Sequence, residues 1–340
     1  MRLGLAGAGF VAQVVHLPHL HDAGDRFRVA ALAEPDARVR EAVAARWDVP
    51  AAFAGHAEML AACELDAVLV CSPNATHAEV VLDALAAGCH VLVEKPLCLG
   101  VGDADRVIDA AGRARRVVQV AYMKRFDPAY EELIHDLARD GDEPAYITSV
   151  TVDPGLAPHF GPYVAPSRPA RSGAGRLLSD AFMGALVHDV NAVHGILDAL
   201  GIDHDGATVA DGFGRSDASL AGGAVVLPGG LRWTMAWAEL PEAGTFDERI
   251  ELLGSRGVRR LDFPAPYLRQ SPTAYRWIRR DPRGGVTRTF RSWRESYTRQ
   301  LEHFHACVTA GEPCRTPPEQ ARADIALLAE LHAATEAVHA

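Results

Sequence analysis

Lys95 is the residue with the clearest chemical potential. It lies in Glu94-Lys95-Pro96, directly after the apolar run 91–93, and only two of the 34 cationic residues, Lys95 and Lys124, are lysines. An arginine guanidinium keeps its proton at working pH, whereas a partly buried ammonium can exchange one. Lys95 is therefore a candidate for proton transfer. Lys124 has no comparable context and is interpreted as a solvated charge or a structural partner.

A glycine-rich turn provides a second candidate, for phosphate binding. Residues 7–12, Gly-Ala-Gly-Phe-Val-Ala, fit the pattern G-x-G-x-x-G/A between an expected strand and an expected helix. Gly7 permits a tight turn, Gly9 lets the backbone approach a pyrophosphate, and Phe10 and Val11 follow where the helix begins. This context predicts a dinucleotide-binding loop, and the alternative is a tight turn without a ligand.

An acidic residue in the expected position bears on the choice of nucleotide. Glu34 ends the second expected strand, 25 residues after Gly9. Its carboxylate can accept hydrogen bonds from ribose hydroxyls and would repel a 2′-phosphate, which favours NAD. Arg38 and Arg40 follow closely, and a flexible arginine there can serve a 2′-phosphate, so NADP stays possible.

The segment Cys71–His77 follows a third apolar run and opens a helix. Its proline ends the strand, and Asn74 can cap the helix. Because the carboxyl ends of parallel strands share one edge of a sheet, Ser72, Asn74 and His77 are predicted cofactor contacts beside the glycine loop. For Asn74 an ordinary capping role is compatible with this. For His77 the alternative is a structural role.

The first 121 residues alternate short apolar runs with alanine-rich segments of helical spacing. This βαβ rhythm predicts an N-terminal Rossmann domain, residues 1–121, with a parallel sheet covered by helices on both faces. The expected strands are 3–6, 29–33, 67–71, 90–93 and 117–121.

After residue 121 the rhythm changes, which predicts a second domain over residues 122–340. We expect an α+β domain with a large, mostly antiparallel open sheet and helices on one face. An apolar open face would need covering, so a homodimer or homotetramer is predicted. The expected elements are helices near 128–139, 177–200, 293–309 and 318–338, and strands near 146–152, 224–227, 231–238 and 249–253.

Composition narrows the class of protein. The chain has 340 residues, 49% hydrophobic content and a formal charge of −10, which disfavours binding to nucleic acid or to anionic membranes. No apolar run approaches 20 residues and no leader precedes the first strand, so a cytoplasmic protein is expected. The six cysteines show neither CxxC pairs nor ligand spacing, so reduced thiols and no metal site are predicted.

Four segments together resemble the glucose-fructose oxidoreductase/inositol dehydrogenase/rhizopine catabolism (Gfo/Idh/MocA) family. The resemblance is dense through about residue 130. It implies that Glu94 and Lys95 lie beside the nicotinamide ribose, that Lys95 binds substrate and transfers protons, and that Tyr122 contacts substrate. The segments are Gly7-Ala8-Gly9 with His16-Leu17-Pro18, Ser72–His77, Ala87–Leu97 and Tyr122–Pro128.

The family's second signature is a glycine-rich turn followed by an aspartate and, four residues later, a histidine. Residues 173–175 resemble the turn and His188 resembles the histidine, but Gly184 stands where the aspartate is expected. Asp180 lies eight residues before His188, about two helical turns away. Either an extra turn is inserted and Asp180 still reaches the site, or the carboxylate is absent and Lys95 with His188 must suffice. We rank His188 above Asp180 as a catalytic candidate. The alternative for His188 is a structural role on a buried helix face.

The loop before this helix is rich in polar side chains that suit a hydroxylated ligand. Arg168 is the substrate-binding candidate there; taken singly, each of these side chains can also be solvated. The others are His159, Tyr163 and Arg171.

The resemblance implies an NAD(P)-dependent dehydrogenase or reductase that interconverts a secondary alcohol and a ketone on a sugar, cyclitol or related polyol. His188 or Lys95 would remove the hydroxyl proton. Two alternatives stay open: redox-neutral glycoside cleavage with retained NAD, and a non-catalytic sensor of nucleotide and sugar.

Overall fold

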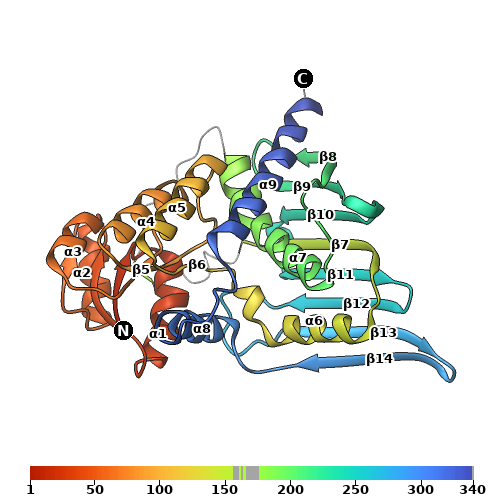
Figure 1. The fold of residues 1–340 in the computed structure, drawn as a ribbon, viewed down its shortest axis with the longest axis horizontal. Helices are drawn as coiled ribbons and strands as arrows, with labels where there is room; N and C mark the ends of the chain where they lie inside the picture. Colours follow the sequence, from red (N-terminus) through yellow and green to blue (C-terminus); the bar gives the residue numbers. More distant parts are fainter. Residues whose placement is uncertain (156–160, 162–163, 166–175, 339–340) are drawn as a thin grey trace. The chain divides into compact units, whose positions relative to one another are not determined.

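The computed structural model describes residues 1–155, 161, 164–165 and 176–338. These residues form two compact units, which Figure 1 colours along the sequence. The predicted boundary at residue 121 lies next to Tyr122, where the first segment of the first unit ends. The return of the chain to the first unit near its end was not predicted. Of the described residues, the first unit contains Met1–Tyr122, residues 161 and 164–165, and Tyr297–Ile325; the second contains Met123–Gly155, residues 176–296 and residues 326–338.

A six-stranded parallel sheet forms the centre of the first unit. Its order, β3-β2-β1-β4-β5-β6, changes direction between β1 and β4, as in doubly wound folds. The predicted Rossmann sheet is thus confirmed; the two-residue strand β3 was missed because its apolar run is too short to give a pattern. The strands are β1 (Arg2–Ala6), β2 (Arg28–Ala33), β3 (Ala52–Phe53), β4 (Ala67–Val70), β5 (His90–Val93) and β6 (Val118–Val120).

Helices connect these strands. The first helical segment is unusual because its middle, η1, is a π-helix, which is wider than an α-helix. Figure 1 shows α4 and α5 side by side. The helical segments of this unit are η1 (Ala12–His16), α1 (Leu17–Asp22), α2 (Ala37–Arg46), α3 (His56–Ala62), η2 (Asn74–Thr76), α4 (His77–Ala86), α5 (Val101–Ala114), α8 (Ser296–Ala310) and the start of α9 (Pro318–Val338).

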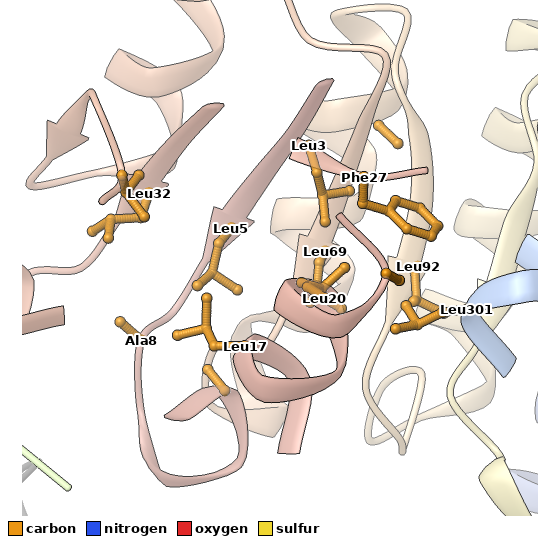
Figure 2. Close-up of a cluster of buried hydrophobic side chains, with 14 of the residues drawn as sticks. Leu3, Leu5, Ala8, Leu17, Leu20, Phe27, Leu32, Leu69, Leu92 and Leu301 are labelled. Atoms are coloured by element: carbon orange, nitrogen blue, oxygen red, sulfur yellow. The ribbon is translucent and has the colours of Figure 1, made fainter. Parts of the chain in front are cut away.

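The apolar core of the first unit includes residues from the far end of the chain. Figure 2 shows leucines of β1, α1, β4 and β5 gathered around the sheet, with Leu301 beside them. Leu301 and Phe304 of α8 are buried in this cluster. Burying such side chains contributes roughly 1.5–3 kcal/mol each. Helix α8 is therefore part of the Rossmann unit's own core.

An eight-stranded sheet organises the second unit, in the order β14-β13-β12-β11-β7-β10-β9-β8. Every pairing is antiparallel except that of β7 with β10. This confirms the predicted mostly antiparallel α+β unit. The strands are β7 (Pro144–Asp153), β8 (Thr208–Gly214), β9 (Leu220–Val226), β10 (Arg232–Glu239), β11 (Asp247–Gly254), β12 (Gly257–Phe263), β13 (Ala274–Asp281) and β14 (Gly284–Arg291).

Helices pack on one face of this sheet. Helix α9 approaches so closely that a Cβ on Gly212 or Gly223 would lie 2.4–2.5 Å from atoms of Leu331. The opposite face is not purely apolar, because Arg260 and Asp262 of β12 form an ion pair there. The dimer or tetramer stays a prediction. The helical segments are η3 (Met123–Phe126), α6 (Pro128–Asp140), η5 (Leu177–Leu186), α7 (Val187–Leu200), η6 (Pro228–Gly230), η7 (Pro241–Ala243) and the end of α9.

The predicted helix 177–200 is present, but it is not α-helical throughout. Its first ten residues form the π-helix η5, and α7 begins at Val187. A π-helix accommodates extra residues within the same axial length, and such segments are frequent at functional sites. The spacing argument between Asp180 and His188, which assumed α-helical turns, therefore does not apply to this segment.

No helix in the described part of the chain is long and apolar enough to cross a membrane.

Candidate functional site: a nucleotide-binding edge and a histidine-bearing helix

Gly7 lies in the turn at the carboxyl end of β1, where only glycine fits. Its φ angle is +92°, and a Cβ would lie 2.6 Å from backbone atoms of Cys71 and Ser72. The turn after β1 therefore packs directly against the turn after β4. These two turns form the centre of the edge where open α/β sheets bind ligands.

Gly9 has the opposite surroundings, because no atom lies within 4 Å of the position its Cβ would occupy. Such open space suits the close approach of a pyrophosphate to the backbone. Phe10 and Val11 begin the helix that follows. Gln13 steadies the loop: its amide nitrogen donates to the Ala8 carbonyl at 2.8 Å, and its amide oxygen accepts from the Ala165 amide at 2.8 Å.

The two glycines give a matched pair of substitutions. Gly7→Ala is expected to destabilise the protein by at least about 1–3 kcal/mol, because its Cβ meets backbone and its φ is strained. Gly9→Ala is expected to leave stability nearly unchanged but to weaken NAD binding about tenfold or more, since its Cβ enters the space proposed for phosphate. Urea unfolding and NAD titration separate the two effects. Equal stability of the variants would contradict this assignment.

Glu34 lies directly beside the glycine loop. Its carboxylate accepts hydrogen bonds from the backbone amides of Ala8 and Asp36, each at 3.0 Å. Arg40 donates to the Glu34 carbonyl at 2.7 Å, while the Arg38 side chain is 88% exposed. Glu34 is thus held as an acceptor at the end of β2, which is the place expected for recognition of the ribose.

The turn after β4 differs from its prediction. Asn74 is the first residue of the short 3₁₀ helix η2, and the residues at the N-cap positions of η2 and α4 are Pro73 and Thr76. The turn is instead stabilised by Thr76, whose hydroxyl donates to Ser72 Oγ at 2.9 Å and to the Pro73 carbonyl at 2.8 Å. Ser72 and Asn74 are half-buried at the sheet edge.

His77 lies behind this turn and is completely buried. Its Nδ1 is 2.7 Å from the Pro96 carbonyl oxygen, and its Nε2 is 2.7 Å from the Ser72 carbonyl oxygen. The ring thereby joins the turn after β4 to the turn after β5. Burial lowers the pKa of His77, although its contacts with the Pro96 and Ser72 carbonyls act to raise it. Any effect of His77 on a cofactor therefore passes through these turns.

Glu94 and Lys95 follow β5 at the same edge. The Glu94 carboxylate is buried, lies 2.6 Å from His16 Nε2 and accepts the Lys95 backbone amide at 3.1 Å. Burial alone would raise the pKa of Glu94, but the hydrogen bond and charge of His16, with Lys95 and His77, lower it overall. Glu94 is thus a fixed carboxylate, and Lys95 is half-buried next to it.

Tyr122 follows β6, and its side chain is almost fully buried. Its amide donates to the Val120 carbonyl at 2.8 Å. The residue lies at the predicted sheet edge, and its substrate contact stays a prediction. Arg168 and the glycine-rich turn 173–175 lie outside the described residues.

His188 and Asp180 belong to the second unit. His188 is half-buried in the first turn of α7. Asp180 is about 40% exposed in η5, and its carboxylate binds Arg176 Nε at 3.0 Å and the Ser179 hydroxyl at 2.7 Å. Asp180 therefore pairs within its own turn. A Cβ at Gly184 would lie 3.2 Å from the Ser179 carbonyl oxygen, which is close contact.

Asp189, the residue after His188, belongs to a buried ionic cluster. Lys124 Nζ lies 2.8 Å from Asp189 and 2.5 Å from Glu248, and Thr151 reaches both carboxylates at 3.4 Å. Lys124 is 2% exposed and its ammonium also lies 4.8 Å from the centre of the Phe263 ring. The predicted solvated state of Lys124 is wrong, and its alternative as a structural partner is confirmed.

Burial opposes the charges of this cluster. Burial would lower the pKa of Lys124, but Asp189 and Glu248 outweigh it and raise that pKa. Burial also raises the pKa of Glu248, with Asp189 adding to the effect and Lys124 opposing it. One ammonium thus serves two carboxylates, and it fixes the start of α7 through Asp189.

Comparison with known proteins places this geometry in a family. Residues 1–122 match the family model described as "Oxidoreductase family, NAD-binding Rossmann fold". An uncharacterised oxidoreductase from Rhizobium meliloti is 34% identical over 142 residues, 42% of each protein. The inositol 2-dehydrogenase of Paracoccus denitrificans is 32% identical over 212 residues, 62% of this chain and 57% of that protein. Residues 1–122 thus match the Gfo/Idh/MocA oxidoreductase family, which supports the predicted resemblance.

The alignment to these two family members spans about half of their length. The fold match is complete: a 3-ketoreductase from Actinomadura kijaniata, solved with NADP and TDP-benzene, gives a TM-score of 0.80 at 20% identity, covering 98% of this chain and 97% of that one. This likeness shows that the chain shares the fold of that protein over nearly its whole length. The first unit is accordingly an NAD(P)-binding Rossmann unit.

The roles of three supporting residues were not predicted from the sequence. Gln13 and His16 lie on the first helical segment and act on Ala8 and Glu94, respectively. Lys124 was predicted as a solvated charge or a structural partner, but its partners were not. The signal available was its rarity together with Asp189 directly after His188, which could have suggested a pair.

Proposed function

We propose that this protein is an NAD(P)-dependent dehydrogenase or reductase that interconverts a secondary alcohol and a ketone on a sugar, cyclitol or related polyol. The observation that carries the proposal is the position of Lys95, half-buried after β5 beside the fixed carboxylate Glu94, at the same edge as the glycine loop. The names of relatives that act on inositol support the substrate class.

The residues at the edge fit a dinucleotide. Gly9 leaves room for the pyrophosphate, and Glu34 presents acceptor oxygens where the adenosine ribose would lie. Ser72 and Asn74 would line the path toward Glu94 and Lys95. When bound, NAD supplies a hydride acceptor for the carbinol carbon. The held carboxylate of Glu34 supports NAD over NADP, since it would repel a 2′-phosphate.

Lys95 and His188 carry the proton chemistry in this proposal. Lys95 Nζ would orient the substrate oxygen and stabilise the developing alkoxide, because an ammonium stabilises negative charge that develops beside it. His188 would take the hydroxyl proton at a ring nitrogen, or Lys95 would take it directly. In reduction the same groups return the proton. Asp180 is a lesser candidate because its carboxylate is already paired with Arg176.

Absorbance of the reduced nicotinamide tests the proposal. The purified protein, NAD or NADP, and a panel of inositols, aldoses and sugar acids should give sustained accumulation of reduced cofactor with at least one substrate. We expect a higher kcat/KM with NAD than with NADP. Product release from glycosides without accumulation would instead support redox-neutral cleavage. Binding of nucleotide and sugar without turnover would support a sensor, which the glycine at position 184 keeps open.

A further inference from the structure

Two buried histidines hold the residues on either side of Lys95. His16, which is 1% exposed, places Nε2 2.6 Å from a carboxylate oxygen of Glu94. His77, which is 0% exposed, places Nδ1 2.7 Å from the Pro96 carbonyl oxygen. The His77 contact reaches main chain, whereas the His16 contact reaches an ionisable side chain. His16 can therefore influence the charge next to Lys95 as well as its position.

His16 is held inside the Rossmann unit. It is the last residue of the π-helix η1, which follows the glycine loop. The hydrogen bond from the Leu17 amide to the Ala12 carbonyl spans five residues, which is the wider spacing of a π-helix. Tyr297 of α8 lies edge-on to the imidazole, with the ring centres 6.2 Å apart. The imidazole is thus enclosed by protein on the side away from Glu94.

Both oxygens of the Glu94 carboxylate face hydrogen-bond donors. Oε1 accepts from His16 Nε2 at 2.6 Å, and Oε2 accepts from the Lys95 backbone amide at 3.1 Å. An ionised carboxylate only accepts hydrogen bonds, so the His16 proton in this bond lies on Nε2. A proton on Oε2 would meet the Lys95 amide hydrogen, and one on Oε1 would force His16 into its other tautomer. The geometry therefore favours the charged form of Glu94.

The groups around Glu94 show how much depends on His16. Burial raises the pKa of Glu94; the hydrogen bond and charge of His16 oppose this first, the charges of Lys95 and His77 follow, and the pKa is lowered overall. On the β4 side, burial raises the pKa of the Cys71 thiol and the charge of Glu94 adds to it. Without His16, burial would meet much weaker opposition and Glu94 would take up a proton at a higher pH.

We propose that His16 is a positioning residue for Lys95: its hydrogen bond keeps Glu94 ionised at acid pH, and the charged carboxylate holds Lys95 in place. This role depends on the proton transfer proposed above for Lys95. Protonation of Glu94 would remove a negative charge beside the Lys95 ammonium and would put a donor where the Lys95 amide needs an acceptor. The acid limit of turnover is then set by His16.

Urea unfolding between about pH 4 and pH 7 tests the ionisation of Glu94 without any substrate. Because the folded-state pKa of Glu94 is lowered, its stabilisation of the parent is present above the ordinary glutamate pKa and is lost as the pH falls through the folded-state value. In His16→Leu burial opposes the charge, so the difference in urea midpoint from the parent should widen as the pH rises over this range. In a Glu94→Gln background the same substitution should lose most of this pH dependence.

The pH profile of kcat/KM connects the ionisation of Glu94 to the reaction. In His16→Leu the acid limb should move upward by about one pH unit or more, while kcat near pH 8 stays within a few fold of the parent. His16→Gln keeps a side-chain donor of similar reach and should recover most of this shift. A role in packing alone would lower turnover at all pH values and would not be rescued by glutamine.

His19→Leu is the matched control for both measurements. His19 is also buried and also contacts the Tyr297 ring, but its Nδ1 lies 2.7 Å from the Val15 carbonyl oxygen of its own helical segment. Neither the acid limb nor the pH dependence of stability should change in this variant. An equal shift of the limb in His19→Leu would overturn the positioning role.

The two measurements separate this proposal from the proposed function. A difference in urea midpoint between His16→Leu and the parent that stays constant with pH would overturn the role of His16, whatever the activity. Absence of turnover in the parent would instead overturn the dehydrogenase function, and the urea comparison would still decide whether His16 keeps Glu94 charged.

Discussion

Lys95→Arg is expected to lower kcat by about 10²–10⁴-fold, the usual contribution of a positioned proton-transfer group. The guanidinium keeps the positive charge beside Glu94, so NAD affinity should change by no more than a few fold. It cannot release a proton at working pH and is too large and planar to replace an ammonium at one oxygen. Steady-state kinetics and NAD titration, measured on the same preparation, give both quantities.

A second variant distinguishes charge from proton transfer. Lys95→Ala removes both, and added methylamine should restore part of its turnover if a primary amine is what the reaction needs. Arg38→Lys, at an exposed position beside the nucleotide loop, controls for a simple change of cation and should leave kcat unchanged. Turnover within a few fold of normal in Lys95→Arg would exclude Lys95 from proton transfer.

Lys124→Met is expected to destabilise the protein by about 3–5 kcal/mol, because it leaves Asp189 and Glu248 as uncompensated buried carboxylates. Glu248→Gln is the matched control: it keeps the Lys124–Asp189 pair and removes one buried negative charge. Its stability should equal or exceed that of the parent. Urea unfolding at neutral pH measures both. A loss in Glu248→Gln as large as in Lys124→Met would show that the cluster requires both carboxylates.

The difference in stability between Glu248→Gln and the parent protein should depend on pH. The folded-state pKa of Glu248 is raised, so the native protein binds a proton more strongly than the unfolded chain. The corresponding stability is present below the ordinary glutamate pKa and is lost as the pH rises through the folded-state value. The advantage of Glu248→Gln over the parent should therefore grow as the pH rises from about 4 toward neutrality. A constant difference would contradict the raised pKa.

The nucleotide edge could be predicted because its features are local. The glycine turn, Glu34 and Glu94-Lys95 each lie directly at the end of an apolar run, and the rule that ligands bind at the carboxyl edge of a parallel sheet brings them together. The structure places all of them at that edge. Family resemblance then supplied roles that spacing alone could not.

The cluster around Lys124 could not be predicted, since its partners lie 65 and 124 residues away in the sequence. No periodic pattern links such positions, and a lysine looks the same whether it is solvated or buried. The π-helical geometry of η5 was missed for a related reason. Its alanine- and leucine-rich sequence satisfies helical spacing, and the choice between α and π turns depends on tertiary packing.

The late position of α8 in the sequence delays completion of the Rossmann core during synthesis. The core of the Rossmann unit includes Leu301 and Phe304, which leave the ribosome about 180 residues after Tyr122. At about 5–20 residues per second, strands β1–β6 wait roughly 10–35 s before that core can close. During this interval their apolar surface is open to chaperones and to aggregation. A chain released prematurely, before α8, would keep that surface exposed.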